Sequence, residues 1–473
     1  MSSHLRRRLA ELDAQIVEQK RVLEELQHTR SDVERELHAT ATYPVVGLPT
    51  DITAEIFGHC VQVFEPVLIP YYYTTSAPIV ISAVCRAWRD IALATPALWS
   101  HLHIFSCSLA TQVVSESGLV EGFIDRWLTR AGNRPLWLGF DSRNDNLTLR
   151  RLRDIIHRWS HRVEYIHLDI GDRDIRLLGL DSANFPLLKG ATLGCDHALS
   201  PITDFSGHIF DNAPQFQELH MQYWWGTPSV FMLAWGQLTK FEGAISDLEL
   251  FTLAPNLTEL YCELTADDSF PIITHRSLIT LKLDPYSFDI VQYLTLPALR
   301  SLDVAHLASY DSLESFLARS SPPLITLSVH GDAQEFESYE DDAESFDLLL
   351  RCLPLVAGTL EDLEFSSVSD KDMLSIPHIL HPLPNIRTVS LVDLEVPLNL
   401  RFLVDFLYER FDKLRSFKVV WPSNVFPFLE GTTYAGPPGT QVYFDTIIGH
   451  LSQVAQSGMD IHLGTADKNY LSM

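Results

Sequence analysis

The sequence lacks the short motifs that usually mark an enzyme or a metal site. It contains no G-x-S-x-G nucleophile elbow, no H-E-x-x-H helix, no G-x-x-x-x-G-K-[ST] phosphate loop and no strand-linked G-x-G-x-x-G. Its 19 histidines are scattered, and pairs such as His157 with His161 have no nearby cysteine or carboxylate cluster. We therefore expect no catalytic residue, no metal ligand and no cofactor.

Cysteine is also rare, and no two cysteines form a C-x-x-C pair. The six lie far apart, and several fall within apolar runs: Cys60, Cys85, Cys107, Cys195, Cys262 and Cys352. The most apolar stretch, residues 66–85, is interrupted by Pro70 and Pro78, unlike a membrane-spanning helix. The charged N-terminus does not resemble a secretory signal. We expect a cytoplasmic or nuclear protein with no membrane partner.

Positive charge is scarce in this chain. The 35 Lys and Arg residues against 61 Asp and Glu residues give a net charge of -26, which opposes binding to a phosphate backbone. Nucleic acid is therefore not an expected partner. At 473 residues the chain is too long for one compact core, so several domains or a repeat array are expected.

Residues 1–42 carry a heptad pattern. Apolar residues alternate at spacings of four and three, with Gln19 and Arg30 as the two exceptions: Leu5, Leu9, Leu12, Ile16, Leu23, Leu26, Val33 and Leu37. This pattern predicts a coiled-coil helix that can form a homodimer. The alternative is a lone amphipathic helix packed on the rest of the chain.

Two apolar blocks with helical spacing follow. Pro49 stands at the start of the first, where proline is favoured, and Asp51 lies near the positive end of the predicted helix. After an insertion comes the second block, residues 79–100, in which Val84, Trp88 and Ile91 recur at helical spacing. Such short helices bury little surface alone, so a partner is expected for this unit.

The two blocks closely resemble the F-box, over about 55 of the 473 residues. The matching segments are Leu48-Pro49-x-Asp51-Ile52-x-x-x-Ile56-Phe57, Val84-Cys85-Arg86-x-Trp88-Arg89 and Pro96-x-Leu98-Trp99. The chain looks like the F-box-like proteins of mushroom-forming fungi, although residues 66–78 form a longer insertion than is usual in that family. The resemblance implies docking on the Skp-type adaptor of a cullin-RING ligase through Leu48, Pro49, Ile52, Ile56, Phe57, Val84, Cys85, Trp88, Ile91, Leu98 and Trp99.

The rest of the sequence repeats an apolar hexamer of the type L-x-x-L-x-L. Its first positions are separated by 19 to 36 residues, mostly within the leucine-rich-repeat range. The first positions are Val163, Leu188, Phe216, Leu257, Leu278, Leu299, Leu324, Leu360, Ile386 and Leu414, with a weaker copy at Leu238. Each hexamer predicts a short strand, and the segments between them have helical spacing.

We therefore predict an α/β chain in which an N-terminal heptad helix and a small all-α F-box precede an irregular leucine-rich-repeat-like solenoid with parallel strands. The predicted boundaries are 1–42 for the coiled-coil helix, 43–105 for the F-box domain, 106–134 for a linker or helix, 135–430 for the solenoid and 431–473 for a C-terminal cap. A large α/β enzyme is the alternative, because its parallel strands also read as apolar runs.

The alternation of the strands predicts the residues of a client-binding surface. Three aromatic residues after one hexamer are added because at least one should project from the loop there. The set is Tyr165, His167, Glu218, His220, Tyr223, Trp224, Trp225, Glu259, Tyr261, Glu263, Lys282, Asp303 and Glu364. The expected function is that of a non-enzymatic substrate receptor for a ubiquitin ligase, with a scaffold that has no ligase role as the alternative. The client is unknown, and a basic segment is favoured.

Overall fold

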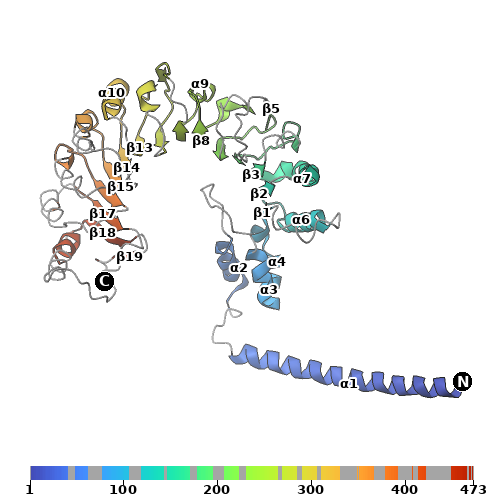
Figure 1. Cartoon of the computed structure of the whole chain (residues 1–473). Coiled ribbons are helices and arrows are strands. Elements are labelled where there is room, and N and C mark those ends of the chain that lie inside the picture. The colour runs from blue at the N-terminus through green and yellow to red at the C-terminus, as the bar shows by residue number, and fades with distance from the viewer. Residues whose placement is uncertain are drawn as a thin grey trace, which may run out of the picture. The chain divides into compact units, whose positions relative to one another are not determined.

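The computed structural model describes residues 2–40, 48–61, 77–105, 119–142, 146–170, 178–194, 207–222, 231–264, 269–284, 290–305, 310–330, 349, 351–366, 379–392, 407, 414–421, 449–456, 458–465, 468–469 and 471. The chain divides into two compact units, with the later boundary between Trp99 and Ser100. Figure 1 shows the helices of the first unit and the long row of strands in the second.

Residues predicted as a coiled-coil helix form one continuous α-helix, α1 (Ser2–Thr40), of 39 residues. Oppositely charged side chains three or four positions apart support it, as in Arg7 with Glu11 and Arg35 with Asp32. The apolar residues of the heptad seam are exposed, Leu9 by 60% and Leu26 by 62%. The helix prediction is confirmed, and the seam is not covered by any described residue.

Three short α-helices and a 3-10 turn form a small helical unit, residues 48–61 and 77–99. The elements are α2 (Thr50–His59), α3 (Ala77–Val84), α4 (Arg86–Leu93) and η2 (Pro96–Trp99). Pro49 precedes α2, and its carbonyl accepts the first helical hydrogen bond from the Thr53 amide at 3.0 Å. Cys85 separates α3 from α4, and its sulfur accepts a hydrogen bond from the Trp88 amide at 3.4 Å. The side chain of Cys85 thus caps α4.

The second unit is built on one long sheet, which we call the strand array. Fourteen strands are paired in parallel, and β19 closes the described sheet in antiparallel pairing with β18. In order they are β1 (His101–Phe105), β2 (Leu136–Ser142), β3 (Val163–Ile170), β4 (Gly190–Gly194), β6 (Glu218–Gln222), β8 (Lys240–Ile245), β9 (Glu259–Leu264), β11 (Thr280–Leu283), β13 (Ser301–Ala305), β14 (Thr326–His330), β15 (Asp362–Ser366), β16 (Thr388–Val392), β17 (Ser416–Trp421), β18 (Asp460–Thr465) and β19 (Lys468–Asn469). The chain is therefore α/β with a large parallel sheet.

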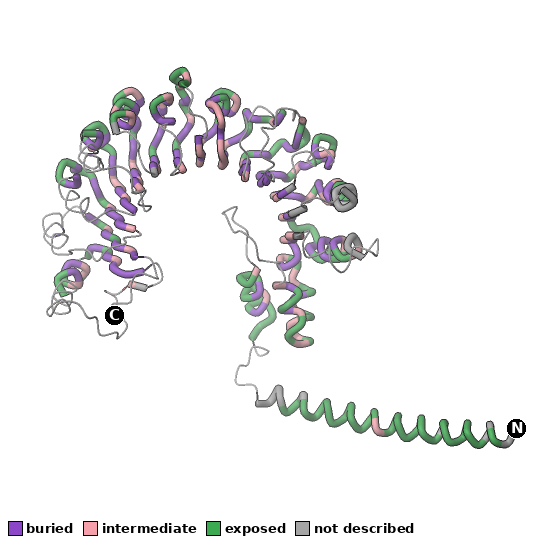
Figure 2. The backbone as a smooth tube through the Cα atoms, viewed as in Figure 1, coloured by how far each residue is buried: buried purple, intermediate pink, exposed green. Residues whose placement is uncertain are grey.

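Every predicted hexamer coincides with one of these strands. Its first apolar residue is buried and, except for Val163 at the start of β3, lies just before the strand, as for Leu257 and Leu299, each 0% exposed. The other two apolar residues lie inside the strand and point to the core, and the pairing keeps them aligned: Leu260 faces Leu281, and Leu281 faces Leu302. Figure 2 shows the resulting succession of buried strand segments. The parallel arrangement predicted from the repeats is confirmed.

The first strand of the sheet lies earlier in the chain than residue 135, the predicted start of the solenoid. Strand β1, which lies in the interval predicted as F-box, pairs in parallel with β2, with Leu102 opposite Leu138. The strand array therefore begins at Ser100 rather than at residue 135. Helix α6 (Leu119–Arg130) lies between these two strands, so residues 106–134 include part of the first connection of the array.

Helices and turns connect the strands on one side of the array. They include α7 (Asn146–Trp159), α9 (Leu250–Leu253) and α10 (Tyr310–Ser320), which lie on the outer side of the curved row of strands in Figure 1. Neighbouring strands are about 4.8 Å apart, closer than packed helices at about 8–10 Å, so the array curves toward its strand side. Shorter elements are η3 (Ser160–Arg162), η6 (Trp235–Gln237), η7 (Ile290–Tyr293), η9 (Leu353–Leu355) and the strand pairs β5 (Gly207–His208) with β7 (Phe231–Met232) and β10 (Ile273–Thr274) with β12 (Leu294–Thr295).

Some predicted features lie outside the described residues. They include most of the insertion at 66–78, the aromatic residues at 223–225 and most of the predicted cap at 431–473. Within that cap, residues 449–456 are helical, and β18 is the last parallel strand of the described sheet. Across the described ranges, none of the helices is both long enough and apolar enough to cross a membrane.

Candidate functional site

Helix α2 has a buried face and, about 100° around the helix axis, an exposed apolar face. Thr53 and Phe57, one turn apart, are buried with exposures of 1% and 2%. Leu48, Ile52 and Ile56, also spaced by one turn, are exposed by 41%, 48% and 46%. Ile52 and Ile56 share one face of α2, and Leu48 lies just before the helix; we call these three exposed apolar residues the α2 stripe. Contiguous apolar surface of this kind is characteristic of a protein-binding site.

The buried face of α2 packs against the rest of the small helical unit. The ring of Phe57 meets the ring of Trp88 edge to face, with 5.0 Å between their centroids. Trp99 is 2% exposed, and its indole N–H donates to the carbonyl oxygen of Ala92 at 2.8 Å. The helical unit therefore buries Phe57 and Trp99 within its own core.

The proposed adaptor-binding residues are thus divided between the surface and the core. Phe57, Leu98 and Trp99 are each no more than 2% exposed, and their role as adaptor contacts stays a prediction. The helical unit has enough neighbouring helix surface to bury them itself. Three residues are half-buried, Cys85, Trp88 and Ile91, and five are exposed, Leu48, Pro49, Ile52, Ile56 and Val84.

Sequence reasoning missed other exposed apolar residues of this unit. Ile79 and Val80 on α3 are 45% and 57% exposed, and Leu93 at the end of α4 is 41% exposed. A signal for the first two was present, since Ile79, Val80 and Ile81 follow one another directly. Consecutive residues of a helix point in different directions, so a single buried face cannot accommodate all three.

The predicted client-binding residues lie on the outward side of the strands. Along β9, Leu260, Cys262 and Leu264 are buried, and the residues between them, Tyr261 and Glu263, are half-buried. The pairing register aligns Tyr261 with Lys282, Lys282 with Asp303 and, two strands further, Ser328 with Glu364. This surface, the outward side of β3 to β15, is called the strand face below.

Two of the predicted client-binding positions require comment. His220 on β6 lies on the strand face but is only 8% exposed, and its role as a client contact stays a prediction. The reason for its burial is the neighbouring strand, where Glu242 Oε1 lies 3.6 Å from His220 Nε2. Tyr223, Trp224 and Trp225 lie outside the described residues, and their predicted role is not tested.

Carboxylates gather near the middle of the strand face. Burial raises the pKa of Glu242, and burial together with the charge of Asp284 raises the pKa of Glu263. Burial, followed by the charges of Asp284 and Glu242, raises the pKa of Tyr261 to about 12. The hydroxyl of Tyr261 donates to Asp284 Oδ2 at 3.4 Å. Crowded carboxylates of this kind repel one another, and a cation placed among them would relieve that repulsion.

Next to these carboxylates, Asp303 is held by two cationic side chains. Its Oδ1 atom lies 2.6 Å from His330 Nε2, and its Oδ2 atom lies 3.3 Å from Lys282 Nζ. The hydrogen bond to Asp303 raises the pKa of His330. Burial alone would raise the pKa of Asp303, but His330 and Lys282 outweigh it, and the pKa is lowered. The Ser366 hydroxyl contacts Nδ1 of the same histidine.

Aromatic rings occupy the N-terminal end of the same sheet, and the sequence identified only part of them. Trp137 lies 5.4 Å from His101 and 4.1 Å from Tyr165, measured between ring centroids. In the next row, two residues further along the strands, the ring of His103 lies 5.1 Å from that of His167. Strands β1 and β2 were not predicted, so His101, His103 and Trp137 were missed.

A glycine makes room for the second aromatic row. Gly139 stands between His103 and His167 in the pairing register. A Cβ atom there would lie 2.6 Å from His103 Cδ2, so only glycine leaves space for the histidine ring. Burial, with the neighbouring His167, lowers the pKa of His103 to about 3. This ring is therefore neutral and packs as an aromatic group.

The described side chains include no group of three or more His, Cys, Asp or Glu residues placed to hold a metal ion. No protein-family model matches the chain, and a search of curated proteins found no match. The geometry described above is thus the basis for a functional proposal.

Proposed function

We propose that this chain is a non-catalytic F-box substrate receptor with a divergent leucine-rich-repeat-like solenoid. In this proposal, the small helical unit docks on the Skp-type adaptor of a cullin-RING ubiquitin ligase, and the strand face holds a client protein. The observation that carries the proposal is the α2 stripe. Ile52 and Ile56 are exposed on a helix whose adjacent face is buried, Leu48 is exposed just before that helix, and all three belong to the segment that resembles the F-box.

Burial of this stripe in a partner would supply binding energy. A fully buried leucine or isoleucine side chain contributes about 1.5–3 kcal/mol relative to an exposed one. Large apolar side chains at the centre of a protein interface are typical binding anchors. Because Phe57 and Trp99 are already buried inside the unit, the unit can remain folded before it meets the adaptor.

The test is co-precipitation of the full chain with a Skp-type adaptor. The double variant Ile52→Ala with Ile56→Ala should lose binding, because both side chains are exposed on the α2 stripe. Leu48→Ala with Pro49→Ala should lose it as well. The matched control is Ile272→Ala with Ile279→Ala, which removes two isoleucines that are 59% and 40% exposed in the strand array. Adaptor binding that survives both α2 variants would refute the proposal.

The client side of the proposal rests on the charge of the strand face. Its carboxylates Glu242, Glu263 and Asp284 lie on three successive strands or directly after them. A client segment rich in Lys or Arg would place positive charge among them.

A ubiquitination assay with the assembled ligase distinguishes a receptor from a scaffold. Transfer of ubiquitin to a captured client supports the receptor, and capture without transfer supports the scaffold.

A further inference from the structure

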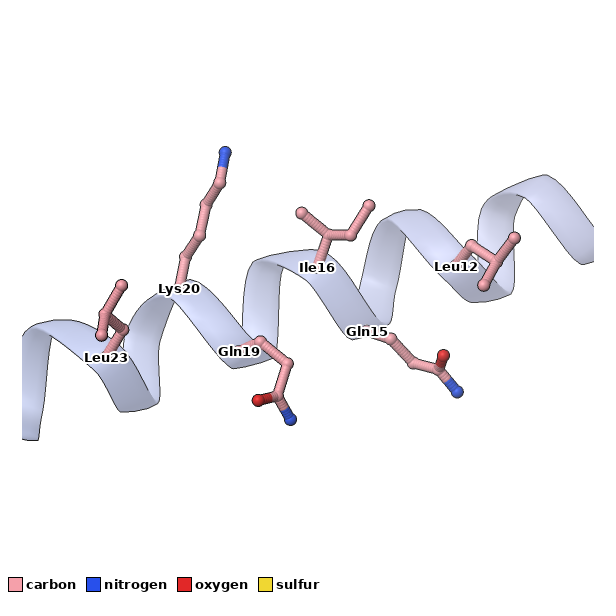
Figure 3. A pocket seen from close by; sticks show the side chains of 6 residues that line it. All are labelled: Leu12, Gln15, Ile16, Gln19, Lys20 and Leu23. Atoms are coloured by element: carbon pink, nitrogen blue, oxygen red, sulfur yellow. The ribbon is translucent and has the colours of Figure 1, made fainter. Parts of the chain in front are cut away.

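The seam of α1 is an apolar surface without a cover among the described residues. Its six described apolar members are each at least 46% exposed: Leu9, Leu12, Ile16, Leu23, Leu26 and Val33. Figure 3 shows a hollow on this surface, with Leu12, Ile16 and Leu23 along the helix, Gln15 and Gln19 on one side and Lys20 on the other. The heptad pattern places the seam residues at the a and d positions of a coiled coil.

We propose that α1 binds α1 of a second copy of this chain as an antiparallel coiled coil centred on Arg21. In this alignment the two helices overlap along the full seam, and each a residue faces a d residue. Leu9 faces Val33 of the partner subunit, and Ile16 faces Leu26 of the partner subunit. The two-fold axis repeats each of these contacts once.

The two polar seam residues favour the antiparallel orientation. A parallel dimer in register would place Arg30 against Arg30 and Gln19 against Gln19, so two like charges would meet inside the seam. In the antiparallel alignment Arg30 faces Leu12 and Gln19 faces Leu23 of the partner subunit. The long aliphatic part of an arginine can pack on leucine while its charged end reaches water. The antiparallel dimer therefore avoids the repulsion.

The residues that flank the seam give the same answer. Arg8 and Glu36 occupy equivalent flanking positions near opposite ends of the helix, and both are exposed. Antiparallel pairing brings Arg8 of each chain to Glu36 of the other, which makes two ion pairs. In a parallel dimer Glu36 would face position 41, beyond the end of α1 at Thr40. At the centre of the dimer, Val22 contacts Val22 of the partner subunit and extends the apolar contact. Lys20 faces Lys20 of the partner subunit, which is one unfavourable contact.

The hollow in Figure 3 has the composition of two neighbouring holes of a coiled coil. Leu12, Gln15, Ile16 and Gln19 surround the first, and Ile16, Gln19, Lys20 and Leu23 surround the second. In knobs-into-holes packing each hole takes one side chain of the facing helix. In the antiparallel alignment these two side chains are Leu26 and Leu23 of the partner subunit. In the parallel alignment the second would be the polar Gln19.

The first test measures the mass of the full chain by light scattering across a range of concentrations. One chain has a mass of 53.6 kDa, and the wild type should give about twice that value. Ile16→Asp places a charge in the seam and should give a monomer. Val17→Asp is the matched control, because Val17 is 68% exposed but lies off the seam. A monomeric wild type, or equal loss of the dimer in both variants, would overturn the proposal.

The second test determines orientation by charge reversal. Arg8→Glu and Glu36→Arg should each raise the dimer dissociation constant about tenfold, and the double variant should restore it, because the ion pair is re-formed with its charges exchanged. In a parallel dimer Glu36→Arg has no partner to repel, and the double variant cannot restore binding. Failure of this rescue would overturn the antiparallel assignment. The inference is independent of the proposed function, since Ile16→Asp should still co-precipitate with the adaptor.

Discussion

The ring of Phe57 on α2 meets the ring of Trp88 on α4 edge to face at 5.0 Å, while Ile56, the neighbour of Phe57 in the sequence, points away from this contact and is 46% exposed. Adjacent residues of one helix therefore have separate tasks. Phe57 holds the helical unit together, and Ile56 is available to a partner. The two tasks can be separated by mutation.

Trp88→Ala should destabilise the helical unit, because it removes an aromatic contact from a small core. Replacing a buried Trp by Ala costs about 3–5 kcal/mol, and the half-buried Trp88 should cost about 2–4 kcal/mol. Hydrogen exchange of peptides from residues 48–61 and 77–99 should show faster exchange. Ile56→Ala should change this protection little, since exposed substitutions are usually within about 0.5 kcal/mol. Unchanged exchange in Trp88→Ala would contradict the role given to this pair.

The sequence predicted most of the strand array because its repeats satisfy three conditions at once. An apolar residue before each strand and two within it must all be buried, as at Leu278, Leu281 and Leu283. A pattern of three fixed apolar positions that recurs many times is rare by chance, so the repeat can be recognised in a single sequence. Strand β2 has Pro135 at the first position, and β18 has Gly458, so neither shows the full hexamer.

The candidate surfaces were harder to predict. Whether a side chain is buried depends on residues that are close to it in the fold but distant from it in the sequence. Phe57 and Ile56 are both large and apolar, and only the direction of each side chain separates core from surface. His220 was predicted to be exposed from strand alternation alone. Its burial depends on Glu242 of the next strand, which belongs to the weakest hexamer copy.

Gly243 explains why that hexamer copy is weak, and it provides a second prediction. It occupies the position at which other copies have a buried apolar residue, with φ +151°. A Cβ atom there would lie 2.7 Å from the carbonyl oxygen of Met221. Gly243→Ala should therefore lower the free energy of unfolding of the strand array by about 1–3 kcal/mol, measured by urea denaturation.

The control for this substitution is Gly236→Ala. An added Cβ atom at Gly236 meets no atom within 4 Å, and its backbone is not in the left-handed region. Its unfolding midpoint in urea should remain close to that of the wild type. If the two variants unfolded at the same urea concentration, close approach to Met221 would not be the reason for glycine at position 243.

The Asp303–His330 pair predicts a pH-dependent contribution to stability. The pKa of His330 is raised above 6.5, so its stabilising effect is complete below pH 6.5 and is lost as the pH rises through the raised value. The pKa of Asp303 is lowered below 3.8, so its effect is lost only as the pH falls through that lower value. The pair is therefore fully stabilising between these limits.

His330→Gln should remove this dependence. The His330 side chain is 35% exposed, so screening by solvent reduces the effect to about 1 kcal/mol or less. The difference in unfolding free energy between wild type and variant should be larger near pH 6 than near pH 9. A difference that grows toward alkaline pH would have the wrong sign and would exclude this mechanism.

The carboxylates of the strand face should determine the preference for a basic client. Glu263→Gln with Asp284→Asn removes two charges, of which that of Asp284 raises the pKa of both Tyr261 and Glu263. Binding of a fluorescent lysine- and arginine-rich peptide, followed by anisotropy, should weaken about tenfold at low salt and less at high salt. The wild type should also lose affinity as the pH falls through the raised pKa values of Glu242 and Glu263, because protonation removes the attracting charge.

The matched control removes the same charge from the helical side of the array. Asp311→Asn with Glu314→Gln neutralises two carboxylates of α10 that contact Arg351 at 3.3 Å and 2.7 Å. Both double variants change the net charge equally, so a general effect of the chain's negative charge would weaken peptide binding in both. A local site on the strand face weakens it only in the first. Equal losses of affinity in the two variants would show that the peptide responds to the total charge of the chain. The strand face would then not be a specific binding site for a basic client.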